Sequence, residues 1–250
     1  MILIDGFPRT GTTTLARLLG EHPDVSCIIE PFHPRRYQGK YHTMAVRSRS
    51  LNDAMRLLAR SYNMIKHVWE PRNGWPFVED SSLNDALWSS CDCVVVITRR
   101  NLLKRYVSAE LSRRLRFWIG TRQDFIKRLS SSTLGPINIA QAKHDIAADY
   151  RALAHRRSQL QLLEIRTVEI FYEDWFEQPL DADAAYEAVT QLLIENDLRP
   201  VTREHFLAAM WRWFAPDQYK WASEDIYLSI ANSRELDREL GTDTTGRLFG

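Results

Sequence analysis

The feature that most constrains the fold is the opening stretch of residues 1–19, MILIDGFPRTGTTTLARLL. Its first four residues are apolar and are typical of a buried strand. A turn with a glycine at each end follows from Gly6 to Gly11, and three threonines then open a helix whose leucines share one face. A strand, a glycine turn and a helix N-terminus in this order predict a phosphate cradle, because converging backbone N–H groups and the helix dipole both favour an anion.

The spacing of this turn, G-x-x-x-x-G, is that of a P-loop, but Thr12 stands where an ATPase or kinase carries lysine. That lysine neutralises the β and γ phosphates of ATP, so its replacement favours a different anion. The positive charge is instead Arg9, inside the loop, and hydroxyls stand at Thr10, Thr12 and Thr13. The alternative interpretation is a tight strand-to-helix turn that binds nothing.

Length and composition indicate one ordinary globular domain. The chain has 250 residues, enough for one large α/β core, so we expect a single domain over residues 1–250. A net charge of +1 implies no general attraction to nucleic acid or to anionic membranes. The cysteines, Cys27, Cys91 and Cys93, have neither disulfide-framework nor zinc spacing. With no leader pattern and no apolar run of membrane-spanning length, we expect a cytoplasmic protein without an integral membrane segment.

Apolar strand-like runs alternate with helical patterns along the chain. The predicted strands cover residues 1–4, 25–29, 63–69, 93–98 and 166–171. The predicted helices cover residues 12–19, 51–62, 83–88, 101–118, 140–163, 182–196 and 203–214, while residues 35–49 and 121–135 are expected to be surface segments. This alternation predicts an α/β fold, a P-loop-like three-layer sandwich with a central, mostly parallel five-stranded sheet flanked by helices.

A second candidate anion site follows the strand at 93–98. Arg99 and Arg100 stand at its carboxyl end, the edge where open α/β sheets bind ligands. Ser108 lies eight residues beyond Arg100, about 12 Å along a helix, so one phosphate could meet both side chains. The alternative is a pair of surface arginines and a solvent-facing serine.

Three segments together resemble the sulfotransferase family. The run Pro8-Arg9-Thr10-Gly11-Thr12-Thr13 resembles its 5′-phosphosulfate loop, P-[KR]-x-G-T-[TS]. The pair Arg100 and Ser108 resembles the 3′-phosphate motif of the cytosolic members, and Phe171-Tyr172-Glu173-Asp174 with Pro179 resembles F-Y-E-D-x-x-x-x-P. The resemblance extends from residue 1 to about residue 179. The family's C-terminal R-K-G-x-x-G-D-W-K loop and the cytosolic dimerisation motif are not found in the sequence.

The resemblance implies an enzyme and its cofactor. The donor would be 3′-phosphoadenosine 5′-phosphosulfate (PAPS), leaving 3′,5′-adenosine bisphosphate (PAP) after its sulfuryl group moves to a hydroxyl of a small-molecule, carbohydrate or lipid acceptor. The cofactor-binding residues would be Pro8, Arg9, Thr10, Gly11, Thr12, Thr13, Arg100, Ser108 and Tyr172, with Tyr172 beside the adenine. Because a sulfuryl group carries less charge than a γ-phosphate, no metal is expected, and no strand end offers an obvious Walker-B aspartate.

The acceptor hydroxyl must lose a proton, and three residues are candidates for the base. Glu30, at the end of the second strand, resembles a glutamate that some bacterial and carbohydrate sulfotransferases use, and is ranked first. His67 is second, since Ile65-Lys66-His67 loosely resembles the cytosolic K-T-H segment out of register by one, and His33 is third. Lys66 is expected to stabilise the bridging oxygen or the sulfuryl group. The alternatives are a solvated strand-end acid for Glu30 and a packed ring for His67.

Two other functions compete with this interpretation. One is an ATP-dependent small-molecule kinase of the P-loop class, against which Thr12 counts. The other is a non-catalytic nucleotide-binding module, which would keep Arg9, Arg100 and Ser108 but would need no base. The sequence identifies neither the acceptor nor the oligomeric state; residues 32–49 and 69–77 are expected to shape the acceptor pocket.

Overall fold

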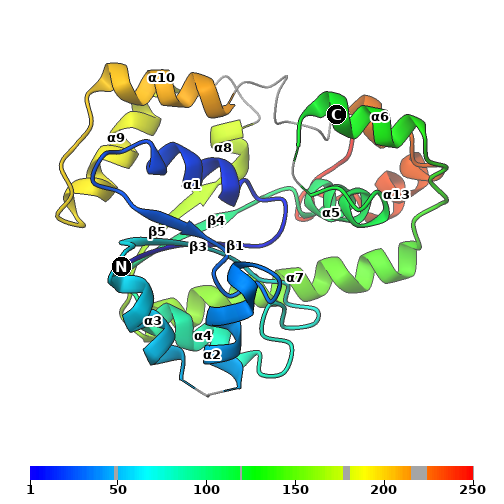
Figure 1. Ribbon diagram of the computed structural model, residues 1–250. Helices are drawn as coiled ribbons and strands as arrows, with labels where there is room; N and C mark the ends of the chain where they lie inside the picture. The colour runs from blue at the N-terminus through cyan, green and yellow to red at the C-terminus, as the bar shows by residue number, and fades with distance from the viewer. Residues whose placement is uncertain (48–49, 119, 177–180, 215–223, 250) are drawn as a thin grey trace.

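The computed structural model describes residues 1–47, 50–118, 120–176, 181–214 and 224–249. Its centre is a five-stranded sheet, shown in Figure 1, with strand order β2-β3-β1-β4-β5. The strands are β1 (Ile2–Gly6), β2 (Cys27–Ile29), β3 (Met64–Val68), β4 (Cys93–Thr98) and β5 (Arg166–Phe171). Every neighbouring pair is parallel, which confirms the predicted α/β class and its parallel sheet.

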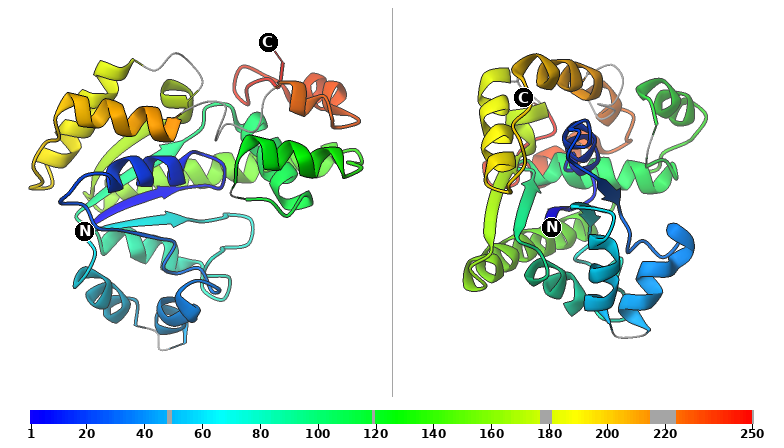
Figure 2. Two further views of the ribbon diagram at one scale, coloured as in Figure 1. Left: turned by 45° about the horizontal axis from the view of Figure 1, so that its top comes forward. Right: turned by 60° about the vertical axis from the view of Figure 1, so that its left-hand side comes forward.

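Helices cover both faces of the sheet, and the right-hand view of Figure 2 shows the sheet between them. One layer holds α1 (Thr12–Gly20), α9 (Ala182–Ile194) and α10 (Arg203–Phe214), and the other holds α2 (Lys40–Val46), α3 (Leu51–Ala59), α4 (Ser82–Ser89) and α7 (Ile139–Leu162). Side chains of β1 alternate between the two layers, because Ile2 and Ile4 pack with α1 while Leu3 packs with α3 and α4. The predicted three-layer sandwich is therefore confirmed.

A further group of helices lies beyond the carboxyl end of β4, as Figures 1 and 2 both show. It comprises α5 (Leu102–Arg114), α6 (Arg122–Ser130), α12 (Glu224–Tyr227) and α13 (Ser233–Leu240). The segment after α13 is tied to α5, since Leu103 N donates to Thr245 O at 3.0 Å and Asn101 Nδ2 donates to Arg247 O at 2.7 Å. These helices therefore form one wall beside the edge of the sheet where the strands end.

Two helices lie in the expected surface segments, where no helix was predicted. Residues 121–135 contain α6, which begins with a capping box between Thr121 and Asp124, and residues 35–49 contain the 3₁₀ turn η1 (Tyr37–Gly39) and α2. Each α-helix fully buries one side chain, Phe125 in α6 and Ala45 in α2. Partly buried neighbours three or four positions away, Leu129 in α6 and Tyr41 in α2, complete a short apolar face. Among the described residues, no helix is long and apolar enough to cross a membrane.

Candidate active site

The phosphate loop, residues 6–11, connects β1 to α1 in a tight turn. Arg9 and Gly11 both have positive φ, 71° and 89°. A Cβ on Gly11 would lie 2.8 Å from the ring of Phe176, and one on Gly6 would lie 2.6 Å from Cγ2 of Thr12, so neither glycine can carry a side chain without rearrangement. The hydroxyl of Thr10 donates to Phe7 O at 2.9 Å and closes the turn. The loop thus brings backbone N–H groups to the N-terminus of α1.

Arg9 extends from this loop to α5. Its Nε donates to Oγ of Ser108 at 3.1 Å, and Ser108 is buried. Burial lowers the pKa of Arg9 to about 10, with Tyr172 acting in the opposite direction and Arg99 adding to the decrease. Arg9 is therefore a half-buried cation that lies among residues from three elements.

Arg99 and Arg100 diverge after β4. Arg99 is only 4% exposed, and its guanidinium carbon lies 4.2 Å from the ring centre of Tyr172. Arg100 is half-exposed; its two terminal nitrogens pair with the carboxylate of Asp174, and its guanidinium carbon lies 4.0 Å from the ring centre of Phe171. The buried arginine next to Arg9 is thus Arg99, whose position sequence reasoning missed.

The start of α8 (Tyr172–Phe176) lies against the phosphate loop. Tyr172 stacks on Phe176 with ring centres 4.7 Å apart, and both rings are close to the position of a Cβ on Gly11. The ring that the resemblance assigns to adenine is therefore beside the loop. Pro179, the last residue of the F-Y-E-D motif, lies outside the described residues.

Glu30 follows β2 and is held between two cations. Nζ of Lys66 donates to its Oε1, and Nε of Arg36 lies 3.3 Å from its Oε2. The parallel register that opposes Ile29 to Lys66 brings this lysine to the end of β2. Burial alone raises the pKa of the Glu30 carboxyl, but Lys66, Arg36 and His33 outweigh burial and hold that pKa below its ordinary value. Glu30 is thus a carboxylate at neutral pH.

His67 and His33 have different surroundings. His67 is 1% exposed, its Nε2 lies 3.0 Å from Oδ1 of Asn84, and its ring stacks on Phe77. Burial lowers its pKa, although nearby Asp5 acts in the opposite direction. His33 is half-buried, accepts a hydrogen bond from Arg35 N at 3.0 Å and meets the ring of Trp75 edge-on. His67 therefore has the environment of a packed core histidine, and His33 that of a partly exposed residue.

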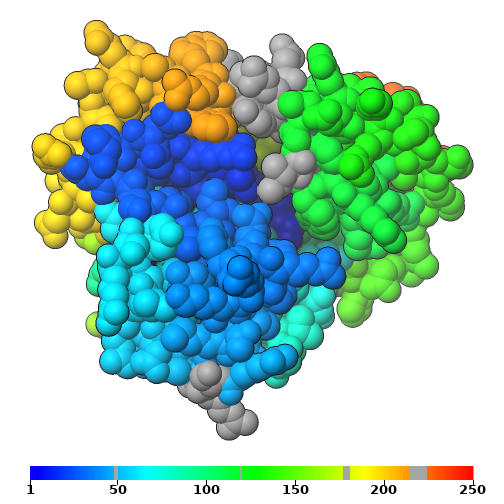
Figure 3. Space-filling view, viewed as in Figure 1, coloured from blue at the N-terminus to red at the C-terminus, as the bar shows by residue number. Residues whose placement is uncertain are grey.

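The space-filling view in Figure 3 shows a hollow between residues near 30–45 and the helices α5 and α6. The start of the chain is visible at its floor. The start of the chain thus lies between the segment that follows β2 and the helices that follow β4. Within the ranges that the structure describes, no group of three His, Cys, Asp or Glu side chains could hold a metal ion.

No curated protein matches the chain. A family model described as the sulfotransferase family matches residues 2–91. The matched segment contains the phosphate loop, Glu30 and Lys66, whereas Arg99, Ser108 and the residues after β5 lie beyond it. The resemblance predicted from the motifs is therefore confirmed: over residues 2–91 the chain matches the sulfotransferase family, with the P-loop-like fold and the transferase class that this family implies.

Proposed function

We propose that the protein is a PAPS-dependent sulfotransferase that acts on a hydroxyl of a small-molecule, carbohydrate or lipid acceptor. The observation that carries the proposal is the meeting of Arg9 with Ser108, through a 3.1 Å hydrogen bond, beside Arg99 and the ring of Tyr172. Two anion-binding elements and an aromatic ring converge on one edge of the sheet, which suits a nucleotide with two separate phosphate groups.

The residues present fit this donor. The glycines let the loop pack tightly, since a Cβ on Gly6 or Gly11 would collide with its protein neighbours, and the loop leads into the N-terminus of α1, whose N–H groups can bind a 5′-phosphosulfate. Ser108 and Arg100 are assigned to the 3′-phosphate by the resemblance, and Tyr172 to the adenine. When bound, PAPS supplies the sulfuryl group and a phosphate leaving group. Arg9 and the loop amides are then aimed at the charge that this phosphate gains.

Glu30 is the proposed base. Its lowered pKa keeps it ionised at neutral pH, so it is ready to accept the proton of an acceptor hydroxyl. Lys66 and Arg36 fix the carboxylate from two sides and limit its orientation. Lys66 is 1% exposed and lies on the face of the sheet that α1 covers, so it is also suited to stabilise negative charge on the transferred group.

A reducing, cytoplasmic compartment suits the three free cysteines.

Binding and transfer can be tested separately. Without metal, PAP is expected to stabilise the protein against unfolding by about 2.7 kcal/mol at a hundredfold excess over its dissociation constant. Stronger stabilisation by ATP with magnesium would instead support the kinase that competes with this proposal. Transfer is tested by incubating the enzyme with ³⁵S-labelled PAPS and a panel of sugars, phenols, steroids and lipids. PAP binding without transfer to any acceptor would favour a non-catalytic nucleotide-binding module.

A further inference from the structure

Two arginine–carboxylate pairs lie buried beneath the phosphate loop. Arg105 of α5 contacts Asp149 of α7, and Nε of Arg156 in α7 lies 3.2 Å from Oδ2 of Asp5 in β1. All four side chains are 0% exposed. Removing charges from water costs free energy that the attraction between them often fails to recover, so a buried pair is weak evidence of added stability. Their place under the loop points to a positional role instead.

Arg105 contacts both the phosphate loop and helix α7. Its Nη1 donates to Pro8 O at 3.5 Å, and its guanidinium carbon lies 5.5 Å from the ring centre of Phe7. Its other terminal nitrogen, Nη2, donates to Asp149 of α7. The two loop residues that it contacts immediately precede Arg9. A movement of Arg105 would therefore move the backbone that carries Arg9.

Arg105 also shares a helix with Ser108. The two residues are three positions apart in α5, so they lie on neighbouring positions of one helix face. Arg105 thus connects the loop expected to bind the 5′ group with the helix that carries the serine expected to bind the 3′-phosphate. Asp149 anchors this connection to α7, a 24-residue helix that also contacts β1 through Arg156.

We propose that Arg105, held by Asp149, is a positioning residue that sets the separation between the phosphate loop and Ser108. The inference rests on the proposed function and extends it: the pair makes the site selective for a nucleotide that carries both a 5′ and a 3′ phosphate. A guanidinium suits this role because its planar fork offers several donors in fixed directions, so one end can bind Asp149 while another binds the loop carbonyl.

The test compares two nucleotides that differ in the 3′-phosphate alone, PAP and 5′-AMP. The variants are Asp149→Asn, which keeps the size of the anchor and removes its charge, and Arg105→Lys, which keeps the charge and removes the fork. In both, isothermal titration is expected to show PAP affinity falling about tenfold and AMP affinity by less than about threefold. The ratio of the PAP affinity to the AMP affinity therefore decreases. A purely structural role would weaken the binding of both nucleotides equally, and that result would overturn the proposal.

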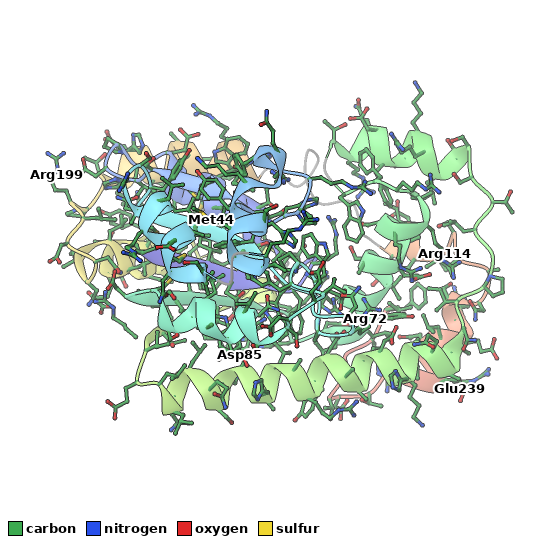
Figure 4. All side chains as sticks on the ribbon, turned by 60° about the horizontal axis from the view of Figure 1, so that its bottom comes forward. Met44, Arg72, Asp85, Arg114, Arg199 and Glu239 are labelled. Carbon is green, nitrogen blue, oxygen red and sulfur yellow. The ribbon has the colours of Figure 1, made fainter. Side chains whose placement is uncertain are left out.

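Asp145→Asn is the matched control. Asp145 is in the same helix one turn earlier and is also buried, but it pairs with Arg72 at 2.8 Å. Figure 4 labels Arg72, which lies in the segment between β3 and α4, beside α7. The control is expected to leave the PAP-to-AMP preference as in the wild type. If Asp149→Asn does not fold, Arg105→Lys decides the question. Failure of the wild type to bind PAP would refute the proposed function, whereas PAP binding with an unchanged preference in Arg105→Lys would refute the positioning role alone.

Discussion

Arg9 and Ser108 are 99 positions apart in the sequence, yet Nε of Arg9 donates a hydrogen bond to Oγ of Ser108 at 3.1 Å. One residue belongs to the loop after β1 and the other to the helix after β4, and these strands are neighbours in the sheet. The two predicted anion motifs thus meet in the structure. Under the proposed function, both side chains would have to adjust when separate phosphate groups bind to them.

The first prediction separates the two arginines after β4. Arg100→Ala is expected to weaken the binding of PAP and leave the binding of AMP nearly unaffected, since the resemblance assigns Arg100 to the 3′-phosphate. Arg99→Ala is expected to weaken the binding of both nucleotides, because Arg99 lies beside Arg9 and the ring of Tyr172. Each loss should be about tenfold or more, the size of a charge-assisted contact. Titration of both nucleotides into both variants checks this; the reverse pattern would assign the 3′-phosphate to Arg99.

The second prediction is that Asp174→Asn binds PAP more tightly than the wild type. Arg100 is paired with both oxygens of Asp174 in the structure, so a phosphate must displace this carboxylate. An exposed pair of this kind contributes about 0.2–1 kcal/mol, so affinity should rise by up to about fivefold. Asp183→Asn, which breaks a similarly exposed pair with Arg203, is the control and should not alter affinity. Weaker PAP binding by Asp174→Asn would mean that the pair holds Arg100 in its binding position.

The sheet could be predicted from the sequence because parallel strands buried on both faces are continuous apolar runs. β4 and β5 match the predicted ranges of 93–98 and 166–171. Helix boundaries were less predictable: α5 ends at Arg114 and not at residue 118, and Arg116 just beyond it has a φ of 50°. A change to a left-handed backbone has no signal in the apolar pattern that defined the helix.

Site residues could be assigned to the correct edge of the sheet, but their partners could not. Parallel strands bring Glu30 and Arg99 to one edge whatever the strand order. The pairing of Glu30 with Lys66, however, depends on which strand lies beside β2 and in which register. Likewise, the pairing of Arg100 with Asp174 joins residues that are 74 positions apart. Such contacts depend on the whole fold and not on any local pattern.

The third prediction is that Glu30→Gln binds PAP normally and loses most of its turnover. The amide keeps the size of the side chain and accepts a hydrogen bond from Lys66, but it cannot take a proton from the acceptor. A loss of about 10²–10⁴-fold in kcat is typical for a general base. His67→Asn is the comparison and should affect stability more than turnover, because His67 is packed against Phe77. Near-normal turnover in Glu30→Gln, with none in His67→Asn, would make the histidine the base.

The last prediction concerns the pH dependence that Lys66 gives to Glu30. Burial raises the pKa of the Glu30 carboxyl, and Lys66 is the largest influence that lowers it. In the wild type the base form is therefore present at all pH values above the ordinary glutamate pKa, and activity falls only when the pH drops below it.

Lys66→Met keeps the length of the apolar stem but removes this charge, which leaves Arg36 as the cation in contact with Glu30. The pKa of Glu30 must then rise, so the acidic limb of kcat/KM against pH should move to higher pH. Arg36→Met is the matched variant, and it should move the limb less, because Arg36 has a smaller effect on this pKa than Lys66. The measurement is a pH–rate profile for both variants with one accepted hydroxyl substrate. An acidic limb that stays in place in Lys66→Met would show that the titrating base is not Glu30. A shift of the limb without loss of PAP binding would support the assignment. It would also separate the effect of Lys66 on the base from any contact of Lys66 with the donor.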